Sequence, residues 1–400
     1  MKNIYLDNAA TTPIDPRVFD AMLPGLRDEF GNPSSAHAHG RSARAAVEKA
    51  REHVAQLLGA DASEMVFTSG GTESDNAAIH MMLGAAGGTA PVHFLTSQAE
   101  HHAIMQPLEQ LEERSVRVDF IGVDSSAVPR LDHVAASFSG DEQLHRCMSL
   151  MHVNNETGGI LDLQQAAAIA DSHSCLFHSD MVQSAGKLPI AIHDLHVDFA
   201  SLSAHKIHGP KGAGALYIRK GMSVDPMMVG GSQERGRRGG TENLIGIIGL
   251  GEAARLAVLE MDERHQRWNK LKMFTTERLG NAFPDIVING DGDAALPNIC
   301  SVTFPADAYP MDGELITARC DLSGLSVSSG SACTAGSVIP SHVMKAIGHD
   351  DASSISTVRL SYGAQTTEDE VRRGVEVLIE VIQDMLDRSS PLSHSRTAMP

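Results

Sequence analysis

Cysteine is scarce in this chain of 400 residues. The five cysteines are odd in number and widely spaced, and no two form a Cys-x-x-Cys pair: Cys147, Cys175, Cys300, Cys320 and Cys333. This pattern disfavours a disulfide framework and a structural zinc site, and it is typical of a reducing compartment.

Long hydrophobic runs are also missing. The segment 1–7 lacks the apolar core of a signal peptide, and nothing later approaches the length of a membrane-spanning helix. We therefore expect a cytoplasmic protein.

Positive charge is also scarce: the chain has 32 Lys and Arg against 50 Asp and Glu, which gives a formal net charge of −18. This imbalance argues against nucleic acid or an anionic membrane as the main partner.

The usual nucleotide and metal signatures are absent from the sequence. There is no Walker lysine motif and no Gly-x-Gly-x-x-Gly fingerprint, which disfavours nucleotide-binding loops. A metal-dependent hydrolase remains a remote alternative, and the residues that it would use show no His-x-x-x-His pair or other familiar ligand spacing: His101, His102, His178, Asp180, His205 and His208. No metal site is predicted.

Short apolar runs alternate with amphipathic segments through the first two-thirds of the chain, and the length favours two domains. The runs predict strands at 65–69, 92–97, 116–123, 147–153, 174–180, 199–203 and 215–219. Strands and helices in alternation predict an α/β fold with a mostly parallel sheet covered on both faces. In such sheets ligands bind beyond the carboxyl ends of the strands.

Three helical patterns complete the outline. Apolar residues at helical spacing over 43–57 end at Gly59, a typical helix stop. A helix over 252–279 is expected to link the two parts of the chain. The last helix opens with a capping box at 367–370, and its apolar stripe is Val371, Val375, Leu378, Ile382 and Met385.

Lys206 follows the strand 199–203, and Asp180 ends the strand 174–180, with Gln183 just after it. A lysine that forms a Schiff base and an aspartate that pairs with a pyridinium nitrogen are the minimum equipment for pyridoxal phosphate. Most lysines after strands are solvated surface residues, so the prediction depends on the two occurring together.

Further polar residues follow other predicted strands. Gly71 and Thr72 stand where a strand leads into a helix, a place suited to a phosphate, although a capped turn is the competing interpretation. His101 follows the strand 92–97, and its imidazole can stack on a pyridine ring. Asn155 follows the strand 147–153. A histidine in this place is more often an ordinary hydrogen-bonded loop residue, and the segment of Asn155 is also compatible with a simple turn.

Two residues in the C-terminal third stand out. Cys333 lies among Gly and Ser, so its thiol is accessible and becomes a nucleophile if its proton is removed; an incidental loop cysteine is the alternative. Arg359 lies inside an apolar run, where a guanidinium needs an anion such as a carboxylate. A structural salt bridge would satisfy it equally well.

In their order along the chain, these motifs resemble the class V group of fold-type I pyridoxal-phosphate enzymes and, within it, the cysteine desulfurases of the NifS and IscS kind. The resemblance covers nearly the whole chain, in the segments 5–12, 31–37, 68–74, 100–103, 153–158, 178–183, 203–206, 233–236, 240–243, 329–333 and 359–361. The Ser-Gly-Ser-Ala-Cys form at 329–333 is similar to the subgroup with the longer cysteine loop.

The resemblance implies pyridoxal 5'-phosphate as the cofactor and a role for each matching residue. Lys206 would form the Schiff base and remove the α-proton, and His101 would stack on the ring and carry protons. The other cofactor contacts would be Asp180 at the ring nitrogen, Gln183 at the phenolic oxygen, and Gly71, Thr72, Ser203 and His205 at the phosphate, with Thr241 contributed by the second subunit of a homodimer.

The resemblance also implies the reaction. Asn155 and Arg359 would bind the carboxylate of L-cysteine, and Cys333 would take the sulfur as a persulfide, leaving L-alanine. The sulfur would pass to an acceptor protein, such as an iron–sulfur scaffold that could share a cluster with Cys333. A selenocysteine lyase, an aminotransferase or another class V enzyme, or a catalytically dead dimeric scaffold are the related alternatives.

The resemblance implies the architecture of fold type I: a large domain with a mostly parallel seven-stranded sheet and a smaller α+β domain. We expect an N-terminal arm at 1–14 that packs with the small domain, the large cofactor-binding domain at 15–262, the small domain with the cysteine loop at 263–388, and a disordered tail at 389–400.

Overall fold

The structure is a computed structural model that describes residues 3–85, 91–112, 116–138, 144–290, 292, 294–329, 331–334 and 337–389. For residues 112, 331–334, 337, 338 and 389 it describes the backbone alone. The predicted tail at 389–400 therefore lies almost wholly outside the described residues.

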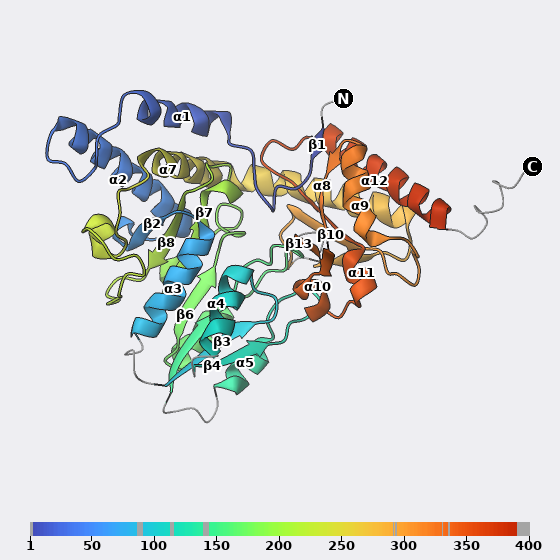
Figure 1. Cartoon of the computed structure of the whole chain (residues 1–400), viewed down its shortest axis with the longest axis horizontal. Helices are drawn as coiled ribbons and strands as arrows, with labels where there is room; N and C mark the ends of the chain where they lie inside the picture. Colours follow the sequence, from blue (N-terminus) through green and yellow to red (C-terminus); the bar gives the residue numbers. More distant parts are fainter. Residues whose placement is uncertain are drawn as a thin grey trace, which may run out of the picture.

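A seven-stranded sheet forms the larger part of the molecule (Figure 1), with the strand order β2-β8-β7-β6-β5-β3-β4. Its strands are β2 (Met65–Thr68), β3 (Val92–Ser97), β4 (Arg117–Ile121), β5 (His145–Ser149), β6 (Leu176–Asp180), β7 (Phe199–Ser203) and β8 (Gly214–Ile218). Strand β8 is antiparallel to both of its neighbours, and the other adjacent pairs are parallel. The prediction of a mostly parallel α/β sheet is confirmed.

Side chains that alternate along the strands supply two apolar layers, one on each face of the sheet. Phe67 and Leu95 belong to the cluster that also contains Val54 of α2, whereas Val66 and Phe94 belong to the cluster on the other face. The first face is covered by α2 (Ala38–Leu58), α5 (Leu131–Ser137), α6 (Leu163–Ser172) and α7 (Leu244–Leu259). The second face is covered by α3 (Gly71–Ala85) and α4 (His102–Glu112). Helix α1 (Pro16–Arg27) lies beside α7 (Figure 1).

The helix predicted over 43–57 is confirmed as part of α2, and Gly59 ends it in the left-handed conformation with φ 68°. The single helix predicted over 252–279 is wrong. The chain is broken at Glu260, where φ is −110° and ψ is 8°, into α7 and α8 (Met261–Ala282). The Glu260 carboxylate accepts hydrogen bonds from Arg17 and Arg264 at the break. Both halves keep apolar residues at helical spacing, so periodicity alone does not reveal the interruption.

The smaller part of the molecule contains a four-stranded antiparallel sheet in the order β12-β15-β10-β9. Its strands are β9 (Val287–Asn289), β10 (Ile299–Thr303), β12 (Ser328–Ser329) and β15 (Thr357–Ser361). Helices α8, α9 (Ile316–Leu322) and α12 (Glu368–Ser389) pack with this sheet in a separate apolar cluster that includes Trp268, Phe304 and Val358. The N-terminal strand β1 (Ile4–Tyr5) pairs with β11 (Leu325–Ser326) beside α12 (Figure 1).

The predicted capping box of α12 is confirmed. The Thr367 backbone N–H donates to Glu370 Oε2 at 3.0 Å, and the Glu370 N–H donates back to Thr367 Oγ1 at 3.2 Å. The whole predicted apolar stripe is buried in the same apolar cluster as Trp268 and Val358. None of the helices in the described part of the chain has the length and apolar character needed to cross a membrane.

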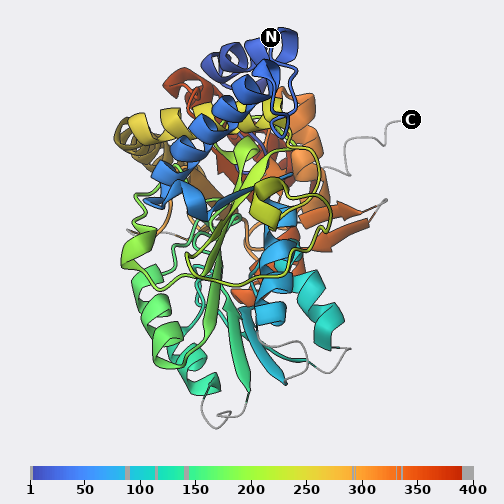
Figure 2. The same ribbon diagram turned by 90° about the vertical axis from the view of Figure 1, so that its left-hand side faces the viewer.

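The chain returns to the large sheet before it ends. A hairpin of β13 (Ser331–Thr334) and β14 (Ser337–Pro340), at the edge of the molecule in Figure 2, leads into α10 (His342–Ala346) and α11 (Asp351–Ile355). Val343 and Met344 of α10 are buried against Ala99, Val123 and Ala127, which follow strands of the large sheet. The end of the hairpin is therefore anchored to the large sheet.

Candidate functional site

A cavity of about 390 Å³ lies beyond the carboxyl ends of the central parallel strands, where β15 of the small sheet approaches them. Its lining includes most of the predicted site residues: Gly71, Thr72, His101, Asn155, Asp180, Gln183, Ser203, His205, Lys206 and Arg359. Thr241 is not among the lining residues, and the side chain of Cys333 lies outside the described part of the chain.

Lys206 lies on a 3₁₀ turn, Ala204–Lys206, directly after β7. Its Nζ donates to the backbone oxygens of Ala9 and Ala10 at 2.6 and 2.9 Å. Burial and the nearby Arg359 guanidinium lower the pKa of Lys206 to about 8. A sizeable fraction of the amine is therefore neutral near neutral pH, which is what a nucleophilic amine requires.

Asp180 is the last residue of β6, and its Oδ1 accepts a hydrogen bond from the Val182 N–H at 2.9 Å. Burial raises the pKa of Asp180, and it raises that of the neighbouring Asp75 still more clearly. A protonated ring nitrogen placed here would stabilise the Asp180 carboxylate. This end of the cavity therefore suits a basic heterocycle.

His101 ends the loop between β3 and α4. Burial lowers its pKa, so the ring is neutral. Its Nδ1 accepts a hydrogen bond from the Ala103 N–H at 3.1 Å, which assigns the proton to Nε2. A neutral, oriented imidazole on the wall of the cavity is suited both to stacking and to carrying a proton.

Another part of the cavity wall is suited to an anion. Gly71 and Thr72 begin α3, whose N-terminus directs backbone N–H groups and a partial positive charge at the cavity. A Cβ on Gly71 would lie 2.9 Å from Val182 Cγ2, so a side chain there would crowd the cavity. Ser203 Oγ is buried without a protein partner, as expected of a hydroxyl that binds a ligand. These residues fit a phosphate.

Arg359 comes from β15 and reaches the cavity from the small sheet. Its guanidinium donates to the Asn155 backbone oxygen at 2.7 Å and to Asp7 Oδ1 at 3.0 Å, while its buried Nε has no partner. Arg359 therefore fits both interpretations made from the sequence: it forms a salt bridge, with Asp7, and it also lines the cavity, where it could bind a carboxylate. A substrate carboxylate could compete with Asp7 for it.

Thr241 is exposed and follows Gly240, outside this chain's own cavity. The segment that leads to it is fixed by Glu234, a buried residue with φ 47° that accepts from Arg51 Nη1 and Nη2 at 2.6 and 2.9 Å. Such a backbone conformation persists only where its surroundings hold it. Cys333 lies in β13 opposite Val338 of β14, and its side chain is outside the described residues.

Several residues of the site were not predicted. Asp7, Ala9 and Ala10 come from the N-terminal arm, Asp75 follows the glycine loop, and Lys187 contacts Gln183. Ala9 and Ala10 contribute backbone oxygens, which every residue has, so the sequence alone does not single them out. Asp75 could have been found, since it lies one turn after Gly71 on the predicted helix.

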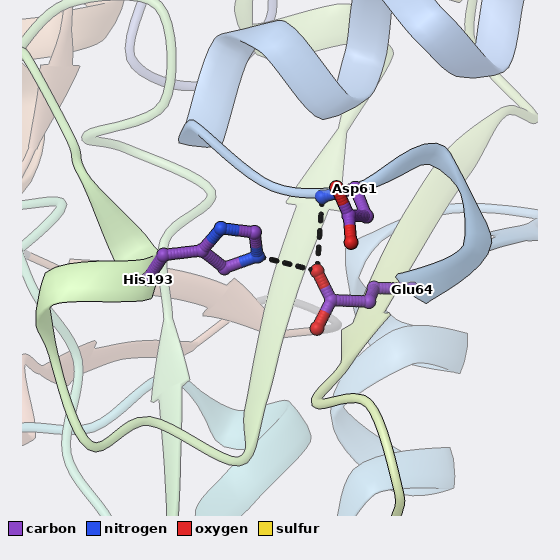
Figure 3. A group of neighbouring side chains, drawn as sticks. All are labelled: Asp61, Glu64 and His193. Carbon is purple, nitrogen blue, oxygen red and sulfur yellow. Dashed lines mark hydrogen bonds and ion pairs between the residues drawn. The ribbon is translucent and has the colours of Figure 1, made fainter.

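One group of three residues among those described could hold a metal ion: Asp61, Glu64 and His193 (Figure 3). Glu64 Oε2 already accepts from His193 Nε2 at 2.6 Å and from the Asp61 N–H at 2.9 Å, and its Oε1 accepts from the Lys220 N–H at 2.9 Å. Asp61 and Glu64 precede β2, and His193 lies between β6 and β7 on a 3₁₀ turn shortly before β7, so the group lies at the amino ends of β2 and β7, away from the cavity. We assign it a structural role.

Comparisons with known proteins agree over nearly the whole chain. The family model for aminotransferase class-V matches residues 4–373. A cysteine desulfurase IscS of Dictyoglomus turgidum is 41% identical over 384 residues, which are 96% of this chain and 95% of that protein. A solved NifS-like protein superposes with a TM-score of 0.87 at 35% identity, covering 96% of this chain and 100% of the other. The structure of SspA in complex with cysteine superposes with a TM-score of 0.78 at 33% identity, over 91% and 99% of the two chains.

Proposed function

Since the chain belongs to the aminotransferase class-V family, and within it to the cysteine desulfurases, we propose that its cavity binds pyridoxal 5'-phosphate and L-cysteine and that Cys333 receives the sulfur. The observation that supports this best is the meeting of Lys206, Asp180 and the unpartnered Ser203 hydroxyl in one cavity. These groups suit the aldehyde, ring nitrogen and phosphate of that cofactor.

Each end of the cofactor has candidate contacts. Lys206 would hold it covalently, Asp180 would pair with its ring nitrogen, and His101 would lie against the ring. Gln183 would bind the phenolic oxygen, and the phosphate would be held by Gly71, Thr72, Ser203 and His205. When bound, the cofactor supplies an electron sink that weakens bonds to the substrate α-carbon.

The chain's own residues would position the substrate and move its protons. Arg359 and Asn155 would bind the substrate carboxylate, and the guanidinium would then exchange Asp7 for it. The Lys206 amine, with its pKa lowered to about 8, would remove the α-proton and return it on the product side. His101 Nε2 would carry a proton between the substrate and the loop.

The sulfur step belongs to Cys333. Its thiolate would attack the substrate sulfur, so that a sulfur–sulfur bond forms while the carbon–sulfur bond breaks. The electron pair of the broken bond stays on the carbon skeleton, which takes up protons and leaves as L-alanine. The persulfide on Cys333 would then pass to an acceptor protein, for which an iron–sulfur scaffold is our leading candidate, in the cytoplasm.

We further propose a homodimer in which Thr241 completes the phosphate site of the partner. Thr241 is exposed, and the nearby Met228 and Val229 are large apolar side chains with 41% and 86% of their surface exposed. A second copy of the chain would cover this surface.

The test uses the purified protein supplied with pyridoxal phosphate. Borohydride should fix the cofactor on the peptide that contains Lys206, and L-cysteine with a thiol reductant should yield equal amounts of alanine and sulfide. Cys333→Ala should keep the cofactor and lose sulfide release. Stoichiometric zinc without any bound aldehyde would refute the proposal and favour the hydrolase alternative.

A further inference from the structure

Lys187 is a second buried lysine beside the cavity, and the proposed chemistry does not use it. Lys187 is only 5% exposed, and its Nζ donates a hydrogen bond to Gln183 Oε1 at 2.9 Å. Burial, with Lys206 and Arg359 nearby, lowers the pKa of Lys187 to about 7. Burying an amine is costly, so an apolar side chain of the same length would be the simpler choice for packing alone.

The contact of Lys187 determines which way the Gln183 amide faces. The Gln183 oxygen is occupied by the Lys187 amine, and the Gln183 Nε2 donates to the Ala9 carbonyl oxygen at 2.9 Å. Ala9 lines the cavity, so the NH₂ end of the amide is the end on the cavity side. A carbonyl oxygen only accepts, so a flipped amide would face Ala9 with its own oxygen and repel it.

We propose that Lys187 is a positioning residue that keeps the NH₂ group of Gln183 directed at the cavity, where it donates to the phenolic oxygen of pyridoxal phosphate. This inference rests on the proposed function. Without Lys187 the amide oxygen is left buried with no donor, and the amide loses its preference for this orientation.

The consequence is electrostatic. A hydrogen-bond donor on the phenolic oxygen stabilises the negative charge on that oxygen. Without the donor, this charge attracts the proton on the nitrogen that links Lys206 to the cofactor more strongly, and the pKa of that nitrogen is higher. The Gln183 amide therefore lowers the pH at which this link titrates. Loss of Lys187 should raise that pH.

The experiment is a pH titration of the cofactor absorbance in the full-length, loaded protein. Lys187→Met should raise the midpoint by about one pH unit and weaken cofactor binding several-fold. Gln183→Leu should shift the midpoint similarly, and adding Lys187→Met to it should change nothing further, because Lys187 acts through Gln183. Lys270→Met, at an exposed position on α8, is the matched control and should titrate like the wild type.

Lys187→Gln is prepared in parallel in case the methionine variant does not fold, since it loses the amine but keeps a donor. A midpoint close to the wild type supports the donor role, and a shift as large as that of Gln183→Leu refutes it. The inference is also wrong if Lys187→Met titrates like Lys270→Met, or if its shift persists in the Gln183→Leu background. A wild-type protein that takes up no pyridoxal phosphate refutes the proposed function and this inference with it.

Discussion

At the residue scale, buried acids and a buried lysine lie in the cavity or close to it. Burial raises the pKa of Asp75, Glu100 and Asp180, that of Glu100 to about 8. Burial also lowers the pKa of Lys206 to about 8. Both groups of residues are thus shifted toward their neutral forms, and a bound cation or anion would restore the charge on its counterpart.

Asp180 gives the most direct test of this electrostatic arrangement. Asp180→Asn keeps the size of the side chain but removes its charge, so the ring nitrogen would lose the group that keeps it protonated. We expect cofactor binding to survive and the turnover of L-cysteine to fall by roughly 10²-fold or more. Steady-state alanine production and the absorbance of the bound cofactor measure the two effects separately. Asp132→Asn, at an exposed position on α5, is the control.

His208 connects three parts of the molecule. Its Nδ1–H donates to the Pro13 oxygen at 3.0 Å, and its Nε2 accepts from the Ala364 N–H at 2.9 Å. Burial lowers the pKa of His208 to about 4. A depressed folded-state pKa means that the unfolded chain binds the proton first, so this residue's contribution to stability is lost as pH falls from about 6.5 to about 4.

We therefore expect His208→Asn to be clearly less stable than the wild type at pH 7.5 and closer to it at pH 5. The difference in free energy of unfolding between wild type and variant should change by about 2 kcal/mol between these two pH values, or roughly 1.4 pH units of linkage, in urea denaturation. His193 provides the contrast, because its hydrogen bond to Glu64 raises its pKa. Its contribution is present below about pH 6.5 and is lost as pH rises, so His193→Asn should show the opposite trend. Parallel trends for the two variants would contradict this assignment.

At the element scale, α10 links the cysteine hairpin to the His101 segment. Ser341 Oγ donates to Glu156 Oε2 at 2.7 Å, and His342 Nε2 donates to the Glu100 backbone oxygen at 2.9 Å. The His342 ring also lies against that of His102, with centroids 4.7 Å apart. The hairpin therefore ends at a fixed point beside the cavity.

This anchor predicts a selective defect in the sulfur step. His342→Ala should leave cofactor loading unchanged and slow the formation of the Cys333 persulfide several-fold, because the hairpin would approach the substrate less often. Single-turnover alkylation followed by mass spectrometry measures the persulfide directly. His133→Ala, at an exposed position on α5, should behave like the wild type. Equal loss of cofactor in both histidine variants would argue for general destabilisation instead.

The elements also show what a sequence can and cannot predict. Strands, the capping box at Thr367 and the polar residues after strand ends were predictable, because each has a local pattern or a local physical cause. The pairing of Arg359 with Asp7 joins residues 352 positions apart, and no periodicity encodes it. The break at Glu260 and the return of α10 to the large sheet likewise depend on contacts with distant elements.

At the scale of the whole molecule, the proposed homodimer can be tested through Thr241. Thr241 is exposed on its own chain, and the buried ion pair between Arg51 and Glu234 fixes the segment that leads to it. Removing one partner of a buried ion pair typically costs about 3–5 kcal/mol, so the pair holds this segment firmly in place. This rigidity would suit Thr241 to the role in the partner's site that we propose for it.

Complementation between two inactive variants tests this arrangement. Thr241→Glu should repel the phosphate in the partner's site, and Lys206→Ala should inactivate the site of its own chain. Neither variant alone should be active. When the two are co-expressed, half of the dimers should be mixed, each with one site that has both Lys206 and the partner's Thr241.

Co-expression should therefore restore about one quarter of the wild-type activity, because one site in two is intact in half of the dimers. If Thr241 served its own chain, every site in the mixed dimer would lack one of the two residues, and no activity would return. Differently tagged subunits allow the mixed dimer to be purified and its cofactor content counted. One bound cofactor per mixed dimer is the expected result, and none would refute a shared site.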